Sequence, residues 1–114
     1  MTIDEYFAKN NFSLIDEKKT PEFFGNYELT YKKDGLLFFL SSDRGQKFLE
    51  IKKEGAKESI SLSLIFDSDN YFSENKIVKC LTDKYSDIVN KMYLLTDEDI
   101  RVLKMNSVKR RLNL

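Results

Sequence analysis

A succession of short apolar segments between residues 27 and 66, separated by polar turns, constrains the fold of this chain more than any other feature. The most apolar segment is LLFFL at residues 36–40, and turn residues follow and precede it. Short bounded runs predict β-strands, and a wholly apolar run predicts a strand that is buried on both faces. We therefore expect a sheet whose core includes Leu37 and Phe39.

Three further strands are predicted at residues 27–31, 47–52 and 60–66. In the first and last of them apolar and polar residues alternate, as they do in a strand with one buried face. Asp34-Gly35 separates the first strand from LLFFL, and this dipeptide is a strong hairpin signal because glycine accepts positive φ. The sequence therefore predicts four hairpin-linked strands that form an antiparallel meander.

Helical signals flank this sheet. Thr2 and Glu5 fit a capping box that would open a helix over residues 3–9. Residues 12–15 are expected to form a packed connector, and residues 16–21 a solvated loop.

After residue 73 the apolar period becomes helical and continues to Leu95, with a break expected between residues 82 and 86. Thr96 and the three acids after it predict a last helix, because acids are favoured in the first turn. Its apolar stripe would comprise Ile100, Leu103 and Val108. The predicted fold class is α+β: an antiparallel β-meander of about four strands, a short N-terminal helix, and C-terminal helices packed on one face.

Length and composition indicate one domain, residues 1–114, with 41% hydrophobic residues to fill one core. The 19 basic and 19 acidic residues balance, but five basic residues and no acid lie from Arg101 onward. The body is therefore acidic and the C-terminal helix basic. The basic cluster at residues 109–111 is typical of helix-dipole compensation, and no aromatic residue follows Tyr93 to stack on bases.

The expected location is cytoplasmic, without a membrane partner. No apolar run approaches the roughly 20 residues that span a bilayer. Asp4 and Glu5 stand where a signal peptide would be basic, and Cys80 has no second cysteine to pair with.

Histidine is absent from the chain, so every catalytic scheme that needs a histidine base is excluded. A zinc site is not expected either, since it would need several Cys or His ligands. Asp67 and Asp69 have partial calcium-loop spacing but lack the glycine and bidentate glutamate that follow in an EF-hand. We therefore expect no cofactor, no metal and no enzymatic activity, with carboxylate catalysis as a remote alternative.

Two polar segments are candidate partner-binding sites. The first is the segment after the sheet, where the aromatic Tyr71 lies among acids: Asp67, Asp69 and Glu74. The second is Asp43-Arg44, which reads either as a hairpin turn or as a protein interface, where arginine is enriched. Nucleic acid is not expected as the main partner.

Residues 27–65 resemble a recurrent pattern in small bacterial immunity proteins, including those of contact-dependent growth inhibition and related polymorphic toxin systems. The resemblance rests on a polar-aromatic strand, a bulky apolar strand, and SDRGQKFLEI at residues 42–51, before a further strand and a helical region.

This resemblance implies a non-enzymatic antitoxin that binds its cognate toxin domain and covers the toxin's active site or substrate surface. The toxin's activity is left open, with a nuclease as one candidate. A monomer is the default state. The alternative function is a nucleic-acid-associated or regulatory module that uses the basic C-terminal helix.

Overall fold

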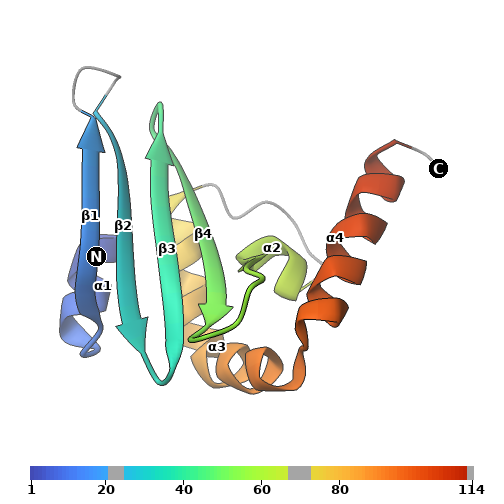
Figure 1. Cartoon of the computed structure of the whole chain (residues 1–114). Coiled ribbons are helices and arrows are strands. Elements are labelled where there is room, and N and C mark those ends of the chain that lie inside the picture. Colours follow the sequence, from blue (N-terminus) through green and yellow to red (C-terminus); the bar gives the residue numbers. More distant parts are fainter. Residues whose placement is uncertain (21–24, 67–72, 113–114) are drawn as a thin grey trace.

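The computed structural model describes residues 1–20, 25–66 and 73–112. It confirms the α+β class and the antiparallel meander, with a five-stranded sheet in the order β1-β2-β3-β4-β5. The strands are β1 (Ser13–Thr20), β2 (Asn26–Lys33), β3 (Leu36–Asp43), β4 (Gln46–Lys53) and β5 (Ile60–Ser61). The helices are α1 (Ile3–Lys9), α2 (Leu62–Ile65), α3 (Glu74–Leu94) and α4 (Asp97–Arg111). Figure 1 shows α1 and α3 behind the sheet and α4 at its side.

The core lies between the sheet and the two helices behind it. Phe7 of α1 is fully buried, and the centroid of its ring lies 4.1 Å from the ring centroid of Tyr31 on β2. α3 contributes a stripe at helical spacing, and β3 and β4 contribute alternate residues. The fully buried members are Leu36, Phe38, Leu40, Ile51, Ile77, Leu81, Ile88 and Met92.

The prediction that residues 36–40 are buried on both faces is wrong. Leu36, Phe38 and Leu40 are buried, whereas Leu37 and Phe39 between them are half-exposed. Successive strand side chains point to opposite faces, so only one face of β3 is covered. No packed layer lies on the second face of β3 in the described part of the chain (Figure 1).

The hairpin at Asp34-Gly35 forms as predicted, with φ of 53° and 73°. The turn also contacts α3, because the Tyr93 hydroxyl donates to the Asp34 carbonyl at 2.6 Å. The Tyr85 hydroxyl donates to the Asp34 carboxylate at 2.7 Å. This end of the sheet is thereby fixed to the helix behind it.

Residues 13–20, which were predicted to be connector and loop, form the edge strand β1 instead. β1 pairs with β2 along its length, with Asp16 opposite Thr30 and Lys18 opposite Glu28. Residues 13–19 are exposed, so neither face imposes an apolar alternation on the sequence. Its charged side chains are typical of edge strands, where they discourage pairing with other chains.

The predicted strand at residues 60–66 is also corrected. Only Ile60 and Ser61 pair with β4, and the chain then turns into α2. The Ser61 hydroxyl accepts from the Leu64 amide at 3.4 Å and so caps this short helix. Leu62 and Ile65 are buried at helical spacing.

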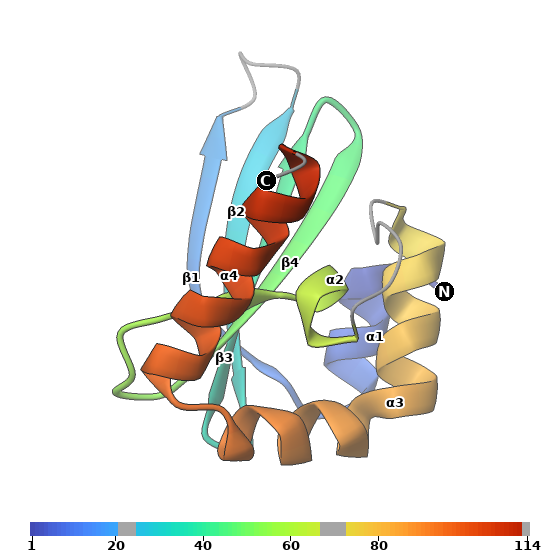
Figure 2. The same ribbon diagram turned by 90° about the vertical axis from the view of Figure 1, so that its right-hand side faces the viewer.

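The two C-terminal helices begin where their caps predict, at Ser73 and Thr96. α3 kinks at Lys84, whose φ and ψ are −128° and 18°, inside the segment where a break was expected. α4 lies at the margin of the molecule, beside α2 and the sheet (Figure 2). Ile100 is buried as expected, but Val108 is 43% exposed and does not lie on the buried side of α4.

Candidate functional site

The uncovered face of the sheet, which we call the open face, presents two rows of side chains that cross the strands. The strand register places the first row opposite one another from β1 to β5: Asp16, Thr30, Phe39, Glu50 and Ser61. The second row comprises Lys18, Glu28, Ser41 and Phe48. All nine of these residues line one groove.

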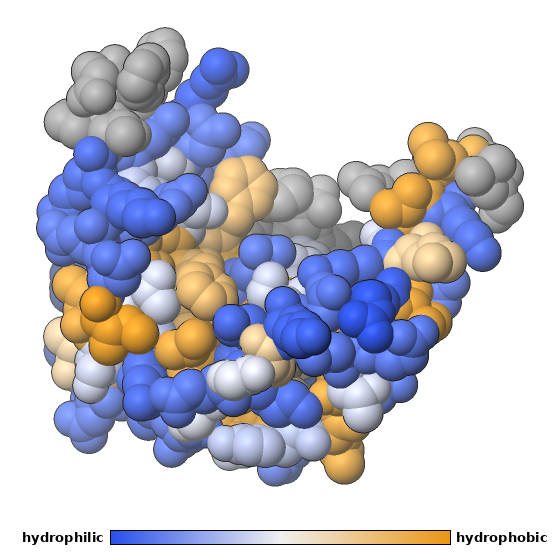
Figure 3. All heavy atoms as spheres, in the orientation of Figure 1, coloured by the Kyte–Doolittle hydropathy of each residue, from blue (hydrophilic) through white to orange (hydrophobic). Residues whose placement is uncertain are grey.

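The groove has a volume of about 800 Å³. Its floor is the open face, one wall is α2 with the residues next to it, and Ser107 of α4 completes the lining. Figure 3 shows the surface hollowed between the sheet and α4, with apolar side chains among polar ones over the strands. The volume lies in the range of ordinary ligand and peptide sites, roughly 300–1,000 Å³.

The groove combines aromatic rings with an excess of acids. Phe39 and Phe48 are half-exposed on β3 and β4. Three exposed carboxylates, Asp16, Glu28 and Glu50, accompany them, against the single base Lys18. Carboxylates accept hydrogen bonds from Lys and Arg, and the rings can bury apolar groups. The groove therefore suits a segment that carries both positive charge and apolar side chains.

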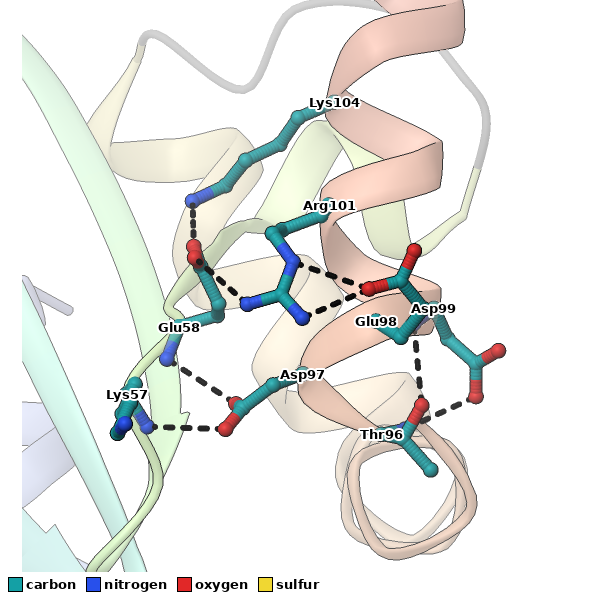
Figure 4. Close-up of polar contacts among 8 residues, drawn as sticks. All are labelled: Lys57, Glu58, Thr96, Asp97, Glu98, Asp99, Arg101 and Lys104. Atoms are coloured by element: carbon teal, nitrogen blue, oxygen red, sulfur yellow. Dashed lines mark hydrogen bonds and ion pairs between the residues drawn. The ribbon is translucent and has the colours of Figure 1, made fainter.

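A polar cluster, which we call the clasp, holds α4 beside this groove (Figure 4). The Asp97 carboxylate accepts hydrogen bonds from the backbone amides of Lys57 and Glu58 at 3.3 and 3.1 Å. The Glu58 carboxylate in turn contacts Arg101 at 3.7 Å and Lys104 at 3.2 Å. The clasp thus ties the first two turns of α4 to the connection between β4 and β5.

The start of α4 is fixed by its own cap as well. The Thr96 hydroxyl accepts from the Asp99 amide at 3.0 Å, and the Asp99 carboxylate accepts from the Thr96 amide at 2.9 Å. Backbone hydrogen bonds to the carboxylates lower the pKa of both Asp97 and Asp99. The hydrogen bond from Arg101 to Glu98 raises the pKa of the Arg101 guanidinium. The hydrogen bonds that cause these shifts stabilise the charged forms of the clasp and of the cap.

Among the described residues, none that the sequence predicted as a partner-binding residue lines the groove. Asp67, Asp69 and Tyr71 fall outside the described residues. Glu74 accepts a hydrogen bond from the Ile3 amide at 2.7 Å, and so joins the start of α3 to that of α1.

Asp43 and Arg44 occupy the β3–β4 turn at the far end of the sheet from the Asp34-Gly35 hairpin. Arg44 has a φ of 53°, and its amide donates to the Asn26 side chain at 3.0 Å. Both side chains are well exposed, Asp43 at 64% and Arg44 at 78%. The structure does not bring this pair together with Glu74, and neither Asp43 nor Arg44 lines the groove.

Sequence analysis missed the groove residues because it assigned Phe39 to the core and residues 16–21 to a loop. One signal was present. Phe39 follows Phe38 in the strand and therefore points to the opposite face, and its cross-strand neighbours Thr30 and Glu50 are polar. A face with polar neighbours on both sides of an aromatic residue is typical of a half-exposed surface.

No group of three or more metal-ligating side chains occurs within residues 1–20, 25–66 and 73–112. Nor does any helix of that part of the chain have the length and apolar character needed to cross a bilayer. No protein-family model matches the sequence, and no curated protein or solved structure proved similar to it.

Proposed function

We propose that this protein is a bacterial immunity protein that binds a toxin domain encoded beside it and neutralises that domain by steric occlusion. It acts in the cytoplasm and without chemistry of its own. The groove over the open face is the surface that binds the toxin.

The observation that carries this proposal is the pair of half-exposed phenylalanines set among carboxylates on a rigid sheet. Interface energy is concentrated in a few anchors, mostly aromatic residues and arginine, that fill well-packed pockets. Here Phe39 lies between Thr30 and Glu50 on the neighbouring strands, so a partner side chain can pack on its ring and reach a carboxylate as well.

The charge of the groove indicates the chemistry of the partner. Three acids and one base favour a basic segment and steer its approach. Toxins that cleave nucleic acid must bind phosphates and present such segments, so a nuclease toxin fits this surface well. A partner that inserts a basic segment here would have that segment covered and unable to bind its substrate.

The sequence resemblance supports the same surface. The segment that resembles immunity proteins, residues 27–65, supplies β2 to β5 and α2, which together form most of the groove.

The test is isothermal titration calorimetry of the neighbouring toxin domain against the wild type and two groove variants, Phe39→Ala and Glu50→Lys. We expect each variant to weaken binding by at least about tenfold, since anchor residues are worth more than about 1.4 kcal/mol. Glu50→Lys should also slow association at low salt.

Two control variants make the same kinds of substitution, a charge reversal and a truncation to alanine, outside the groove. Asp87→Lys reverses an exposed acid on α3, and Leu94→Ala removes an apolar side chain that is 80% exposed. Both should bind as the wild type does. Equal affinity of all five proteins for the toxin would show that the groove is not the binding surface. Failure of the wild type to bind any neighbouring gene product would refute the immunity function.

The alternative is a nucleic-acid-associated module that uses the basic α4. Two of its bases, Arg101 and Lys104, already contact Glu58 within the clasp. This arrangement leaves less positive charge for phosphates than the sequence suggests. Retention on DNA or RNA that falls steeply with salt, together with no binding to the toxin, would favour the module.

A further inference from the structure

α4 carries an exposed apolar surface that does not line the groove. Three of its apolar side chains are exposed, Val102 at 46%, Met105 at 57% and Val108 at 43%, and so is that of its C-cap residue, Leu112, at 61%. They are spaced three, three and four residues apart, so they lie along one side of the helix. We call them the outer stripe.

The outer stripe faces away from the groove. At 3.6 residues per turn it lies roughly opposite Ile100 and Leu103, which pack on the core, and Ser107, which lines the groove. Figure 3 shows apolar side chains at the surface along α4. The outer stripe and the groove are therefore formed by different side chains.

The charges beside the outer stripe are self-complementary. Glu98, exposed in the first turn, and Lys109, exposed near the end, lie on the same side of α4 as Val102 and Met105. The order Glu98, Val102, Met105, Lys109 has spacings of four, three and four residues, which are the same when read backwards. An antiparallel copy of the helix would therefore place Lys109 opposite Glu98 and Met105 opposite Val102, twice over.

We propose that the outer stripe binds the outer stripe of a second copy of this chain, in an antiparallel α4–α4 pair with two-fold symmetry. In such an interface each contact occurs twice, so both Glu98–Lys109 pairs form together. A parallel pair would instead oppose Glu98 to Glu98 and Lys109 to Lys109.

The size of the surface sets the strength of the dimer. α4 has 15 residues and is about 22 Å long. One helix pair of this length buries less than the roughly 800 Å² per partner of a standard stable interface. The proposed dimer is therefore weak and forms as the concentration rises, whereas the sequence led us to expect a monomer.

Sedimentation velocity of the full chain, from micromolar to millimolar concentration, is the first test. The wild type should shift from monomer to dimer, and Met105→Glu should weaken the dimer by at least about tenfold, since each copy then places an unpaired charge in an apolar contact. Asn90→Glu adds the same charge at an exposed position on α3, away from the outer stripe, and should leave the dimer intact.

Charge reversal gives the sharper test. Glu98→Lys and Lys109→Glu should each weaken association, and the double variant should restore it, because the reversed pair is again complementary. Circular dichroism melting checks each variant, since Glu98→Lys also loses a 2.7 Å contact with Arg101 in its own chain.

Three outcomes overturn the proposal. They are a wild type that stays monomeric throughout, a double variant no better than the single ones, and a Met105→Glu variant that loses toxin binding but dimerises normally. The last result would assign the outer stripe to the toxin.

Discussion

Adjacent residues of β3 belong to two different parts of the molecule. Phe38 points to the covered face and is fully buried, whereas Phe39 points to the open face and is half-exposed. The two residues have the same chemistry and differ in what lies above them: α1 and α3 on one side, the groove on the other (Figure 1). The comparison shows that an apolar residue in a strand can serve the core or a binding surface, according to the layer that covers it.

The largest expected effect is on the free energy of unfolding when Phe38 and Phe39 are replaced by alanine in separate variants. Phe38→Ala should lower the free energy of unfolding by about 3–5 kcal/mol, since it leaves a cavity in a packed core. Phe39→Ala should cost less, about 1–2 kcal/mol, because its ring is only partly buried and its removal leaves no enclosed cavity. Chemical denaturation of both variants measures the difference, and equal losses would show that the second face is covered as well.

A smaller effect extends the comparison to the turns at the two ends of β3, each of which contains a glycine. Gly35 and Gly45 both have positive φ, at 73° and 86°, so alanine at either position is strained by about 1–2 kcal/mol. A Cβ at Gly35 would also lie 2.5 Å from the Tyr93 hydroxyl, whereas at Gly45 nothing lies within 4 Å. Gly35→Ala should therefore be the more destabilising by about 1 kcal/mol, since the hydroxyl must leave the Asp34 carbonyl.

The control for the turn comparison is Gly35→Ala combined with Tyr93→Phe. Removing the hydroxyl first should bring the cost of alanine at Gly35 close to its cost at Gly45. If the costs stay as far apart in thermal melts, the contact with α3 does not distinguish the two turns.

The smallest effect concerns α4, which contributes Ser107 to the groove and which the clasp ties to the connection between β4 and β5. The pKa of Asp97 and that of Asp99 lie below their ordinary value of 3.8 in the folded protein. Their stabilising contribution is complete above that value and is lost as the pH falls through the lower folded pKa. Amide NMR signals of α4 should therefore change at acidic pH before those of α3.

Asp97→Asn is the matched variant for the acid effect, since it keeps the shape of the side chain without its charge. Its α4 signals should depend less on pH than those of the wild type over the same acidic range. Simultaneous loss of α3 and α4 signals in the wild type would contradict a separate role for the clasp.

The elements predicted correctly are those fixed by interactions between near neighbours in the chain. Thr2, Ser73 and Thr96 each accept a backbone hydrogen bond from the residue three positions later, and each begins a helix where the sequence indicated. The Asp34-Gly35 turn likewise needs only its own two residues to take positive φ. Such caps and turns are readable because their partners lie within the same few residues.

The candidate site was harder to predict, since its residues come from five strands and two helices. Asp16 belongs to a strand that exists because β2 pairs with it, and its own sequence has no strand pattern. Ser107 lines the groove only because the clasp places α4 there. Neither relation leaves a local pattern in the sequence.

The sequence by itself determined the meander, the starts of α1, α3 and α4, the hairpin at Gly35 and the absence of histidine chemistry, because these depend on residue type and short-range spacing. The tertiary structure decided the edge strand β1, the turn of residues 62–65 into α2, and the exposure of Phe39 and Val108. The physical reason is that burial depends on whether a distant segment packs against a surface. The LLFFL run favours burial on both faces, but the packed helices cover only one of them.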